Sequence, residues 1–105
     1  MTEPCIVVVR RGALHLARDA YERFFDMLNN VVLLRDGKDL VVLPVRHQAA
    51  GGYLLKLRNG AGDRIVSAAD FFRANGIDDD VQMTLTAEWS DERMALIAAD
   101  AFMQT

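Results

Sequence analysis

The residues best suited to bind a ligand are two groups of basic side chains, each beside a predicted turn. Together they are Arg10, Arg11, Arg18, Lys56, Arg58 and Arg64. Guanidinium and ammonium groups donate charge-assisted hydrogen bonds to phosphate and carboxylate oxygens. If both groups share one face, they predict a surface that contacts mainly the phosphates of a nucleic acid. The competing interpretation is that the six side chains are scattered and only keep strand ends soluble.

Metal-ligating and nucleophilic residues are few. Cys5, His15 and His47 are the strong metal ligands, and they are widely spaced, so we predict neither a metal site nor a cofactor. Ser67 and Ser90 are the only serines, and a helix cap and a turn explain them better than a catalytic role does. No nucleophile-elbow, phosphate-loop or dinucleotide-binding motif occurs. We therefore predict that the chain is not an enzyme.

These chemically active residues also have structural explanations. Cys5 begins an apolar strand and is predicted to be a buried thiol that packs as a small hydrophobe. His15 stands between two leucines and is predicted to face outward. His47 lies in a glycine-rich connector, where a solvated loop is favoured and a functional loop residue is the alternative. Asp78–Asp80 lacks the later glutamate of a calcium loop and is predicted to be a solvated turn.

The charge is distributed unevenly along the chain. The net charge is −3, but residues 1–64 carry ten Lys or Arg against seven Asp or Glu, whereas residues 65–105 carry two against eight. Such a division is compatible with a polyanion-binding face beside an acidic one. It is equally compatible with two copies of the chain that attract each other. Both interpretations stay open.

Length and composition predict one soluble domain over residues 1–105. About half of the residues are apolar and a quarter are charged, as is usual for globular proteins. The apolar runs are far shorter than the roughly 20 residues that span a bilayer, and the start of the chain does not resemble a signal peptide. A single cysteine fits a reducing compartment. We expect a cytoplasmic protein without a membrane partner.

The first half is predicted to contain two hairpins that flank a helix. The expected elements are strands 5–10 and 14–16, a helix over 16–28, and strands 31–35 and 39–43. Asn29–Asn30 is expected to end the helix, because Asn tolerates the left-handed conformation. Asp36–Gly37 predicts a type I′ hairpin turn. Pro44 is expected at a strand end, since it has no amide hydrogen to donate.

The second half repeats this order after a connector over 46–52. The expected elements are strands 53–58 and 64–66, a short helix, strand 81–87 and a closing strand within 94–97. Ser67 and Asp70 resemble a capping box, and Asn75–Gly76 followed by Ile77 resembles a Schellman helix end. A helix over 90–103 is about as well supported by composition as the closing strand. The similarity between the halves favours the strand.

That similarity takes the form of an internal repeat. With an offset of fifty residues, the matched pairs are Leu16 and Val66, Tyr21 and Phe71, Arg23 and Arg73, Met27 and Ile77, and Val31 and Val81. The turns and helix ends also follow in the same order. Neither half could bury its own apolar face, so the two are expected to pack on each other.

A β–turn–β–short helix–β–turn–β unit used twice resembles the swapped-hairpin domains of the AbrB, MazE and MraZ type, over residues 5–98. The resemblance implies an α+β, mainly β fold: a pseudo-two-fold, barrel-like domain of two β-β-α-β-β half-units, about 5–45 and 53–98, joined by the connector. The family commonly carries basic residues around its first hairpin. The residues that match are Arg10, Arg11 and Arg18 in one half and Lys56, Arg58 and Arg64 in the other.

Two functional interpretations stay open. The first is a small non-catalytic interaction or accessory domain that binds another protein or itself, with exposed strand edges and the acidic final third as its surfaces. The alternative, implied by the resemblance, is a DNA-binding transcriptional regulator that uses the two basic hairpins. The acidic total charge favours the first. Basic turns that face acidic neighbours would weaken the second.

Overall fold

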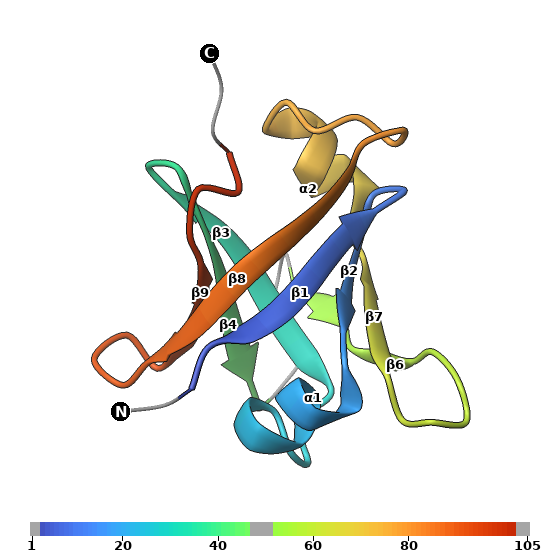
Figure 1. The fold of residues 1–105 in the computed structure, drawn as a ribbon, viewed down its shortest axis with the longest axis vertical. Coiled ribbons are helices and arrows are strands. Elements are labelled where there is room, and N and C mark those ends of the chain that lie inside the picture. Colours follow the sequence, from blue (N-terminus) through green and yellow to red (C-terminus); the bar gives the residue numbers. More distant parts are fainter. Residues whose placement is uncertain (1–2, 47–51, 103–105) are drawn as a thin grey trace.

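The computed structural model describes residues 3–46 and 52–102. Its elements, in chain order, are β1 (Cys5–Arg10), β2 (Ala13–Leu16), α1 (Arg18–Phe24), β3 (Asn30–Asp36), β4 (Asp39–Val45), β5 (Tyr53–Leu54), β6 (Lys56–Leu57), β7 (Arg64–Ser67), α2 (Ala69–Ala74), β8 (Gln82–Ser90) and β9 (Ala95–Ala98). The helices lie at opposite ends of the sheet (Figure 1). Among these described elements, no helix is long and apolar enough to cross a bilayer.

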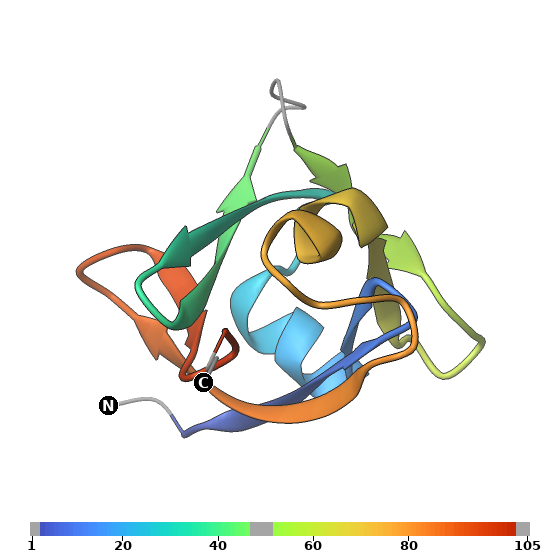
Figure 2. The same ribbon diagram turned by 90° about the horizontal axis from the view of Figure 1, so that it is seen from above.

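The strands form one antiparallel sheet that curls into a nearly closed barrel, as Figure 2 shows from above. The strand order is β5-β3-β4-β9-β8-β1-β2-β7-β6. The two end strands are consecutive in the chain and are separated only by Leu55, so a bent segment joins β3 to β7. The mainly β, barrel-like prediction is therefore confirmed. Exposed strand edges were expected as a binding surface. Within the described chain, only the two-residue strands β5 and β6 have a single neighbouring strand, so no long edge is exposed.

The bend at Leu55 corrects one prediction. The alternation along the expected strand 53–58 predicts that Tyr53, Leu55 and Leu57 share one face. Leu55 is buried at 5% exposure, but Leu57 is 60% exposed. The segment changes its hydrogen-bonding partner from β3 to β7 between Leu54 and Lys56, and this change breaks the alternation of inward and outward side chains.

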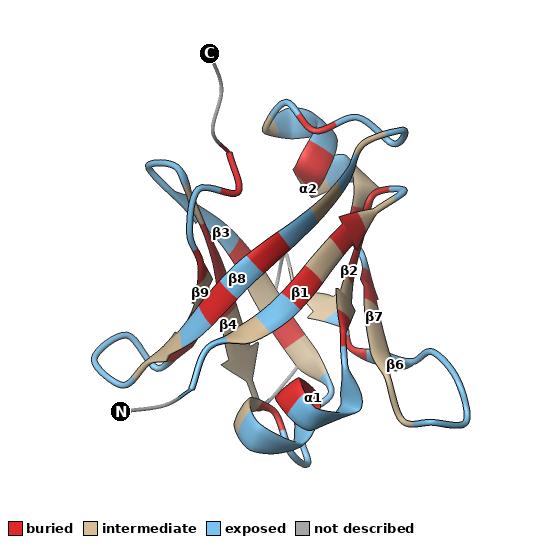
Figure 3. Cartoon of the chain, in the orientation of Figure 1, coloured by how far each residue is buried: buried red, intermediate tan, exposed pale blue. Residues whose placement is uncertain are grey.

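The interior is filled by alternate strand residues and by aromatic side chains from both ends. Figure 3 shows the alternation as buried and exposed bands along β1 and β8. The sequence alternation predicts inward side chains at Val81, Met83, Leu85, Ala87 and Trp89. Leu85 and Ala87 are buried and the other three are partly buried, which confirms the prediction. From the ends, α1 and the residue after it supply Tyr21 and Phe25, and α2 supplies Phe72.

The first helix ends earlier than predicted. It stops at Phe24, and the expected stop at Asn29–Asn30 is wrong, since Asn30 already belongs to β3. Phe25 donates its backbone N–H to the carbonyl of Tyr21 at 2.8 Å and packs fully into the core. The left-handed residue is Met27, with φ +69°. Burial of Phe25 thus redirects the chain before the asparagines.

The second helix begins one residue later than predicted and ends as predicted. Ser67 is the last residue of β7, so the capping box is wrong: the N-cap is Ala68, without a side-chain hydrogen bond. At the other end the backbone N–H of Ile77 bonds the carbonyl of Phe72 at 2.8 Å, beside a left-handed Gly76 with φ +86°. This is the Schellman pattern.

The two remaining turn predictions had mixed outcomes. The β3–β4 hairpin is confirmed, but its central residues are Gly37 and Lys38 and only Gly37 has positive φ, so the type I′ assignment is wrong. Pro44 lies near the end of β4, beyond the residues that pair with β9.

At the C-terminal end, β9 pairs with both β4 and β8. The predicted closing strand within residues 94–97 is therefore confirmed, and the alternative helix over residues 90–103 is wrong.

Candidate nucleic-acid or protein interface

A hollow of about 350 Å³ lies on the outer face of β1, β2 and β7; its lining residues are Arg10, Arg11, Ala13, His15, Arg58, Ile65 and Ser67. A second hollow of about 250 Å³ shares His15 and Arg58 with it and is otherwise lined by Ile6, Val8, Leu16, Ala17 and Asp63. We call the two adjoining hollows the His15 groove. The groove has a basic part and a mainly apolar part.

Strand register places His15 at the centre of this groove. It pairs with Val8 on one side and with Ile65 on the other. Its neighbours Leu14 and Leu16 are buried in the barrel, so the imidazole points outward. The predicted outward orientation is confirmed, and the side chain is half-buried.

Two arginines from different hairpins flank the histidine. Arg10 is the last residue of β1, and Arg58 follows β6, where its backbone N–H bonds the carbonyl of Asp63 at 2.7 Å. Burial lowers the pKa of His15, and the positive charges of Arg10 and Arg58 lower it further. His15 is therefore mainly neutral at pH 7, and the fixed positive charge of the groove comes from the arginines. The carboxylate of Asp63 partly offsets it, because its Oδ2 lies 3.9 Å from Nη1 of Arg58.

The structure brings only part of the predicted basic set together. Arg10, Arg11 and Arg58 line the groove. Lys56 is exposed on β6 and pairs in register with Ile65, but it does not line either hollow.

The other two predicted residues, Arg18 and Arg64, do not line the groove and have partners elsewhere. Arg18 pairs with Glu22 at 3.0 Å, and its stem packs closely against Gly62. Arg64 stacks its guanidinium over the Tyr21 ring at 4.1 Å. Arg64 is therefore held by a cation–π contact with Tyr21 on α1, and Arg18 is held by an ion pair with the residue four positions later.

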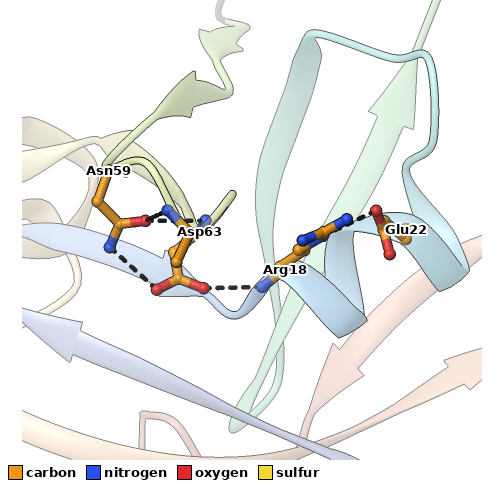
Figure 4. Close-up of polar contacts among 5 residues, drawn as sticks. Arg18, Glu22, Asn59 and Asp63 are labelled. Carbon is orange, nitrogen blue, oxygen red and sulfur yellow. Dashed lines mark hydrogen bonds and ion pairs between the residues drawn. The ribbon is translucent and has the colours of Figure 1, made fainter.

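Asp63 lines the groove and organises the turn before β7; Figure 4 shows its contacts with Asn59 and Arg18. Its carboxylate accepts hydrogen bonds from Asn59 Nδ2 at 3.0 Å and from the backbone N–H of Arg18 at 2.9 Å. Arg18 is the first residue of α1, so Asp63 satisfies a free amide at the helix start from a distant part of the chain. The bond from Asn59, then that from Arg18, lowers the pKa of Asp63.

Replacing Asp63 by asparagine should lower the melting temperature at neutral pH, because the amide nitrogen cannot accept the bond from Asn59. A carboxylate whose pKa falls below its ordinary value of 3.8 on folding stabilises the protein above that value and loses this effect as the pH falls through the folded pKa. The difference in melting temperature between wild type and variant should thus be largest near pH 7 and shrink below pH 3.8. Thermal unfolding at pH 7, 5 and 3 measures it. A constant difference would contradict this role.

Acidic residues bound the groove on its other side. Arg10 and Arg11 also line a neighbouring hollow of about 420 Å³ with Asp79 and Asp80. A long polyanion that crossed the groove in this direction would meet these carboxylates.

The remaining candidates lie elsewhere. Cys5 is half-buried rather than buried, and burial raises the pKa of its thiol above the ordinary value, which fits an unreactive side chain. His47 lies outside the described residues. Within residues 3–46 and 52–102, no group of three or more His, Cys, Asp or Glu side chains could hold a metal ion. A separate hollow of about 500 Å³ adjoins Trp89, whose ring stacks on Phe24 at 5.3 Å.

Ile65 and Ser67 also line the groove, although neither was predicted as a site residue. Ser67 had been assigned to a helix cap, and Ile65 to an ordinary strand position. The alternation of β7 could have indicated that both face outward with His15, but the pairing of β2 with β7 was needed to place them beside it.

No family model matches the chain, and no match was found among curated proteins or solved structures. The geometry of the groove is therefore the basis for assigning a function.

Proposed function

We propose that this chain is a non-catalytic interaction domain that binds an anionic partner in the His15 groove. The observation that carries this proposal is that Arg10 and Arg58, from two different hairpins, line one hollow around His15. A guanidinium keeps its charge throughout the physiological pH range and donates several hydrogen bonds in a fixed geometry, which suits the recognition of oxyanions. Binding there would involve side chains of at least three strands and so would depend on the folded barrel.

We also propose that the barrel is a duplicated swapped-hairpin domain. Support comes from the strand order: exchanging β1 with the β5–β6 segment, β2 with β7, β3 with β8 and β4 with β9 leaves the order around the barrel unchanged. The hairpin turns support it too. The Gly12 carbonyl accepts a bond from Ala68 at the start of α2, while Asp63 accepts one from Arg18 at the start of α1. The groove then lies across the pseudo-two-fold axis, between β2 and β7.

The surroundings of His15 favour binding over catalysis. A histidine that acts as a general base is commonly oriented by a carboxylate that also stabilises its protonated form. The charged groups that act most strongly on His15 are Arg10 and Arg58, which disfavour its protonation. An arrangement of this kind attracts a negatively charged group rather than removing a proton.

A small tricarboxylate tests the interaction proposal. Citrate added to isotope-labelled protein should shift the backbone amide NMR signals of residues around His15 before those of other regions. The double variant Arg10→Gln/Arg58→Gln should lose this response, because both fixed charges are gone. Lys38→Gln/Arg46→Gln removes the same net charge from exposed positions outside the groove and should retain it. An equal response in both variants would show non-specific binding.

DNA binding by an AbrB- or MraZ-like regulator is the second candidate. The observation that favours it is the meeting of basic residues from both predicted hairpins, Arg10 and Arg58, in one hollow. DNA binding is the second candidate because Asp79 and Asp80 share a hollow with Arg10 and Arg11 and would repel phosphates. If it is correct, a mixed-sequence duplex should bind at about 50 mM salt and weaken steeply by about 200 mM, because cations are released from phosphates. Fluorescence anisotropy measures this, and absence of binding at the lower salt would exclude the candidate.

A further inference from the structure

We infer that the occupant of the His15 groove is a short segment of a partner protein in which a carboxylate stands next to an apolar side chain. This inference rests on the proposed function and names the chemistry of the partner. It follows from the composition of the groove, from what bounds it and from the pairing of its strands.

The two hollows differ in chemistry but are continuous. The first places Arg10, Arg11 and Arg58 around His15 and therefore suits an anionic group. The second is mainly apolar, and Ile6, 54% exposed, forms part of its wall. Because His15 and Arg58 line both hollows, a ligand group in one lies next to a ligand group in the other. A carboxylate and an adjacent apolar side chain on one peptide satisfy both.

The acidic residues at its borders limit the length of an anionic ligand. Asp63 lines the apolar hollow, accepts hydrogen bonds from Asn59 and Arg18, and lies 3.9 Å from the guanidinium of Arg58. Asp79 and Asp80 share the neighbouring hollow with Arg10. An extended polyanion would place charges against these carboxylates, and like charges repel. A segment with one or two carboxylates keeps its charge between the arginines.

The lining of the groove also distinguishes peptide from single-stranded nucleic acid. Proteins that bind single strands without sequence preference stack bases on aromatic side chains. The described residues that line the two hollows include no Phe, Tyr or Trp. The apolar surface offered by Ile6, Val8 and Ile65 matches aliphatic side chains, which a nucleic acid backbone lacks.

The partner segment must bind through its side chains. The strands beneath the groove, β1, β2 and β7, are each hydrogen-bonded on both sides. Their backbone groups are therefore not free to accept an added strand, as a peptide bound at a sheet edge requires. The affinity should then depend on the arginines and on the apolar wall.

The test uses an acetylated, amidated hexapeptide of sequence Gly-Asp-Leu-Asp-Leu-Gly, titrated into isotope-labelled full chain at about 50 mM salt, where screening of charges is weak. We expect amide signals of Val8, His15 and Ile65 to shift together. Arg10→Gln/Arg58→Gln should weaken binding about tenfold, because charge-assisted hydrogen bonds are lost. Ile6→Ser should weaken it about fivefold, because an exposed apolar contact is lost. Lys38→Gln/Arg46→Gln should leave binding unchanged.

Two altered peptides test the two halves of the inference. Asn in place of Asp should abolish the response at the arginines, and Ser in place of Leu should weaken binding about as much as Ile6→Ser does. If the Asn peptide binds as tightly as the original, carboxylate recognition is wrong. If the Ser peptide does so, the apolar contact is wrong.

Parallel titrations separate the failure of this inference from that of the proposed function. If duplex DNA or inorganic phosphate shifts the groove at lower concentration than the peptide does, the domain binds anions but the peptide inference is overturned. If the groove signals change on dilution without any probe, the occupant is a second copy of the chain, and the inference of a different partner is likewise overturned. If peptide, citrate, phosphate and duplex all leave the groove unchanged, both proposals fail.

Discussion

Replacement of Gly12 by alanine is expected to lower the free energy of unfolding by about 3 kcal/mol, from the combined costs of a left-handed side chain and of overpacking. Gly12 has φ +72°, which L-residues adopt at a cost. A Cβ added there would lie 2.6 Å from the Cβ of Ala69 and 2.8 Å from its Cα. The carbonyl of Gly12 also accepts a hydrogen bond from the backbone N–H of Ala68 at 3.0 Å. The turn therefore cannot move away from α2 without breaking this bond.

Gly37→Ala is the matched control. Gly37 also lies in a two-residue hairpin turn with positive φ, +62°, but an added Cβ there would meet no atom within 4 Å. The loss of stability should be only about 1 kcal/mol, from the backbone conformation alone. Urea denaturation followed by far-UV circular dichroism and by the fluorescence of Trp89, the only tryptophan, measures both. Equal losses in the two variants would contradict tight docking of the β1–β2 turn on α2.

Replacement of Phe72 by alanine should cost about 3–5 kcal/mol of stability, as large-to-small changes of buried aromatics do. The Phe72 side chain is fully buried, at 0% exposure, and its ring meets Phe71 edge-to-face with centroids 5.4 Å apart. A domain of this size has a total stability of about 5–15 kcal/mol. The variant should therefore unfold at much lower urea concentration, or be partly unfolded in buffer.

Phe71→Ala provides the comparison within the same helix. Phe71 is only partly buried. Its ring makes T-shaped contacts with Phe72 and Phe102, and the centroids of Phe71 and Phe102 are 6.0 Å apart. Loss of its ring should cost about 1–2 kcal/mol, from partial burial and the aromatic contacts. Both variants keep the backbone bonds at the end of α2. A Phe71 variant that is less stable than the Phe72 variant would contradict the orientation of this helix.

Local sequence signals predicted the elements whose cause is local. The β-branched run of β1, the alternation of β8 and the glycine-containing hairpin between β3 and β4 all follow from side-chain preference or turn chemistry. The Schellman end of α2 is also local, because Gly76 and Ile77 bond within one turn of Phe72. In these places the physical reason and the residues that express it lie within a few positions of each other.

Other local signals were overridden by contacts between distant residues. Ser67 has the chemistry of a helix cap, but pairing with Ala13 keeps it in β7. Asn29–Asn30 has the chemistry of a helix stop, but burial of Phe25 ends α1 first. The Phe71 and Phe72 pair carried no signal of which ring is fully buried, because that depends on how α2 lies over the barrel end.

The sequence by itself determined a mainly β fold and a limited set of basic side chains near turns. Tertiary structure alone decided which of these side chains meet. Pairing of β2 with β7 brings His15 to Ile65, and the bent segment at Leu55 brings Arg58 to the same face as Arg10. The reason is physical: strand register depends on long-range hydrogen bonds, and a shift of one residue reverses the face of every side chain.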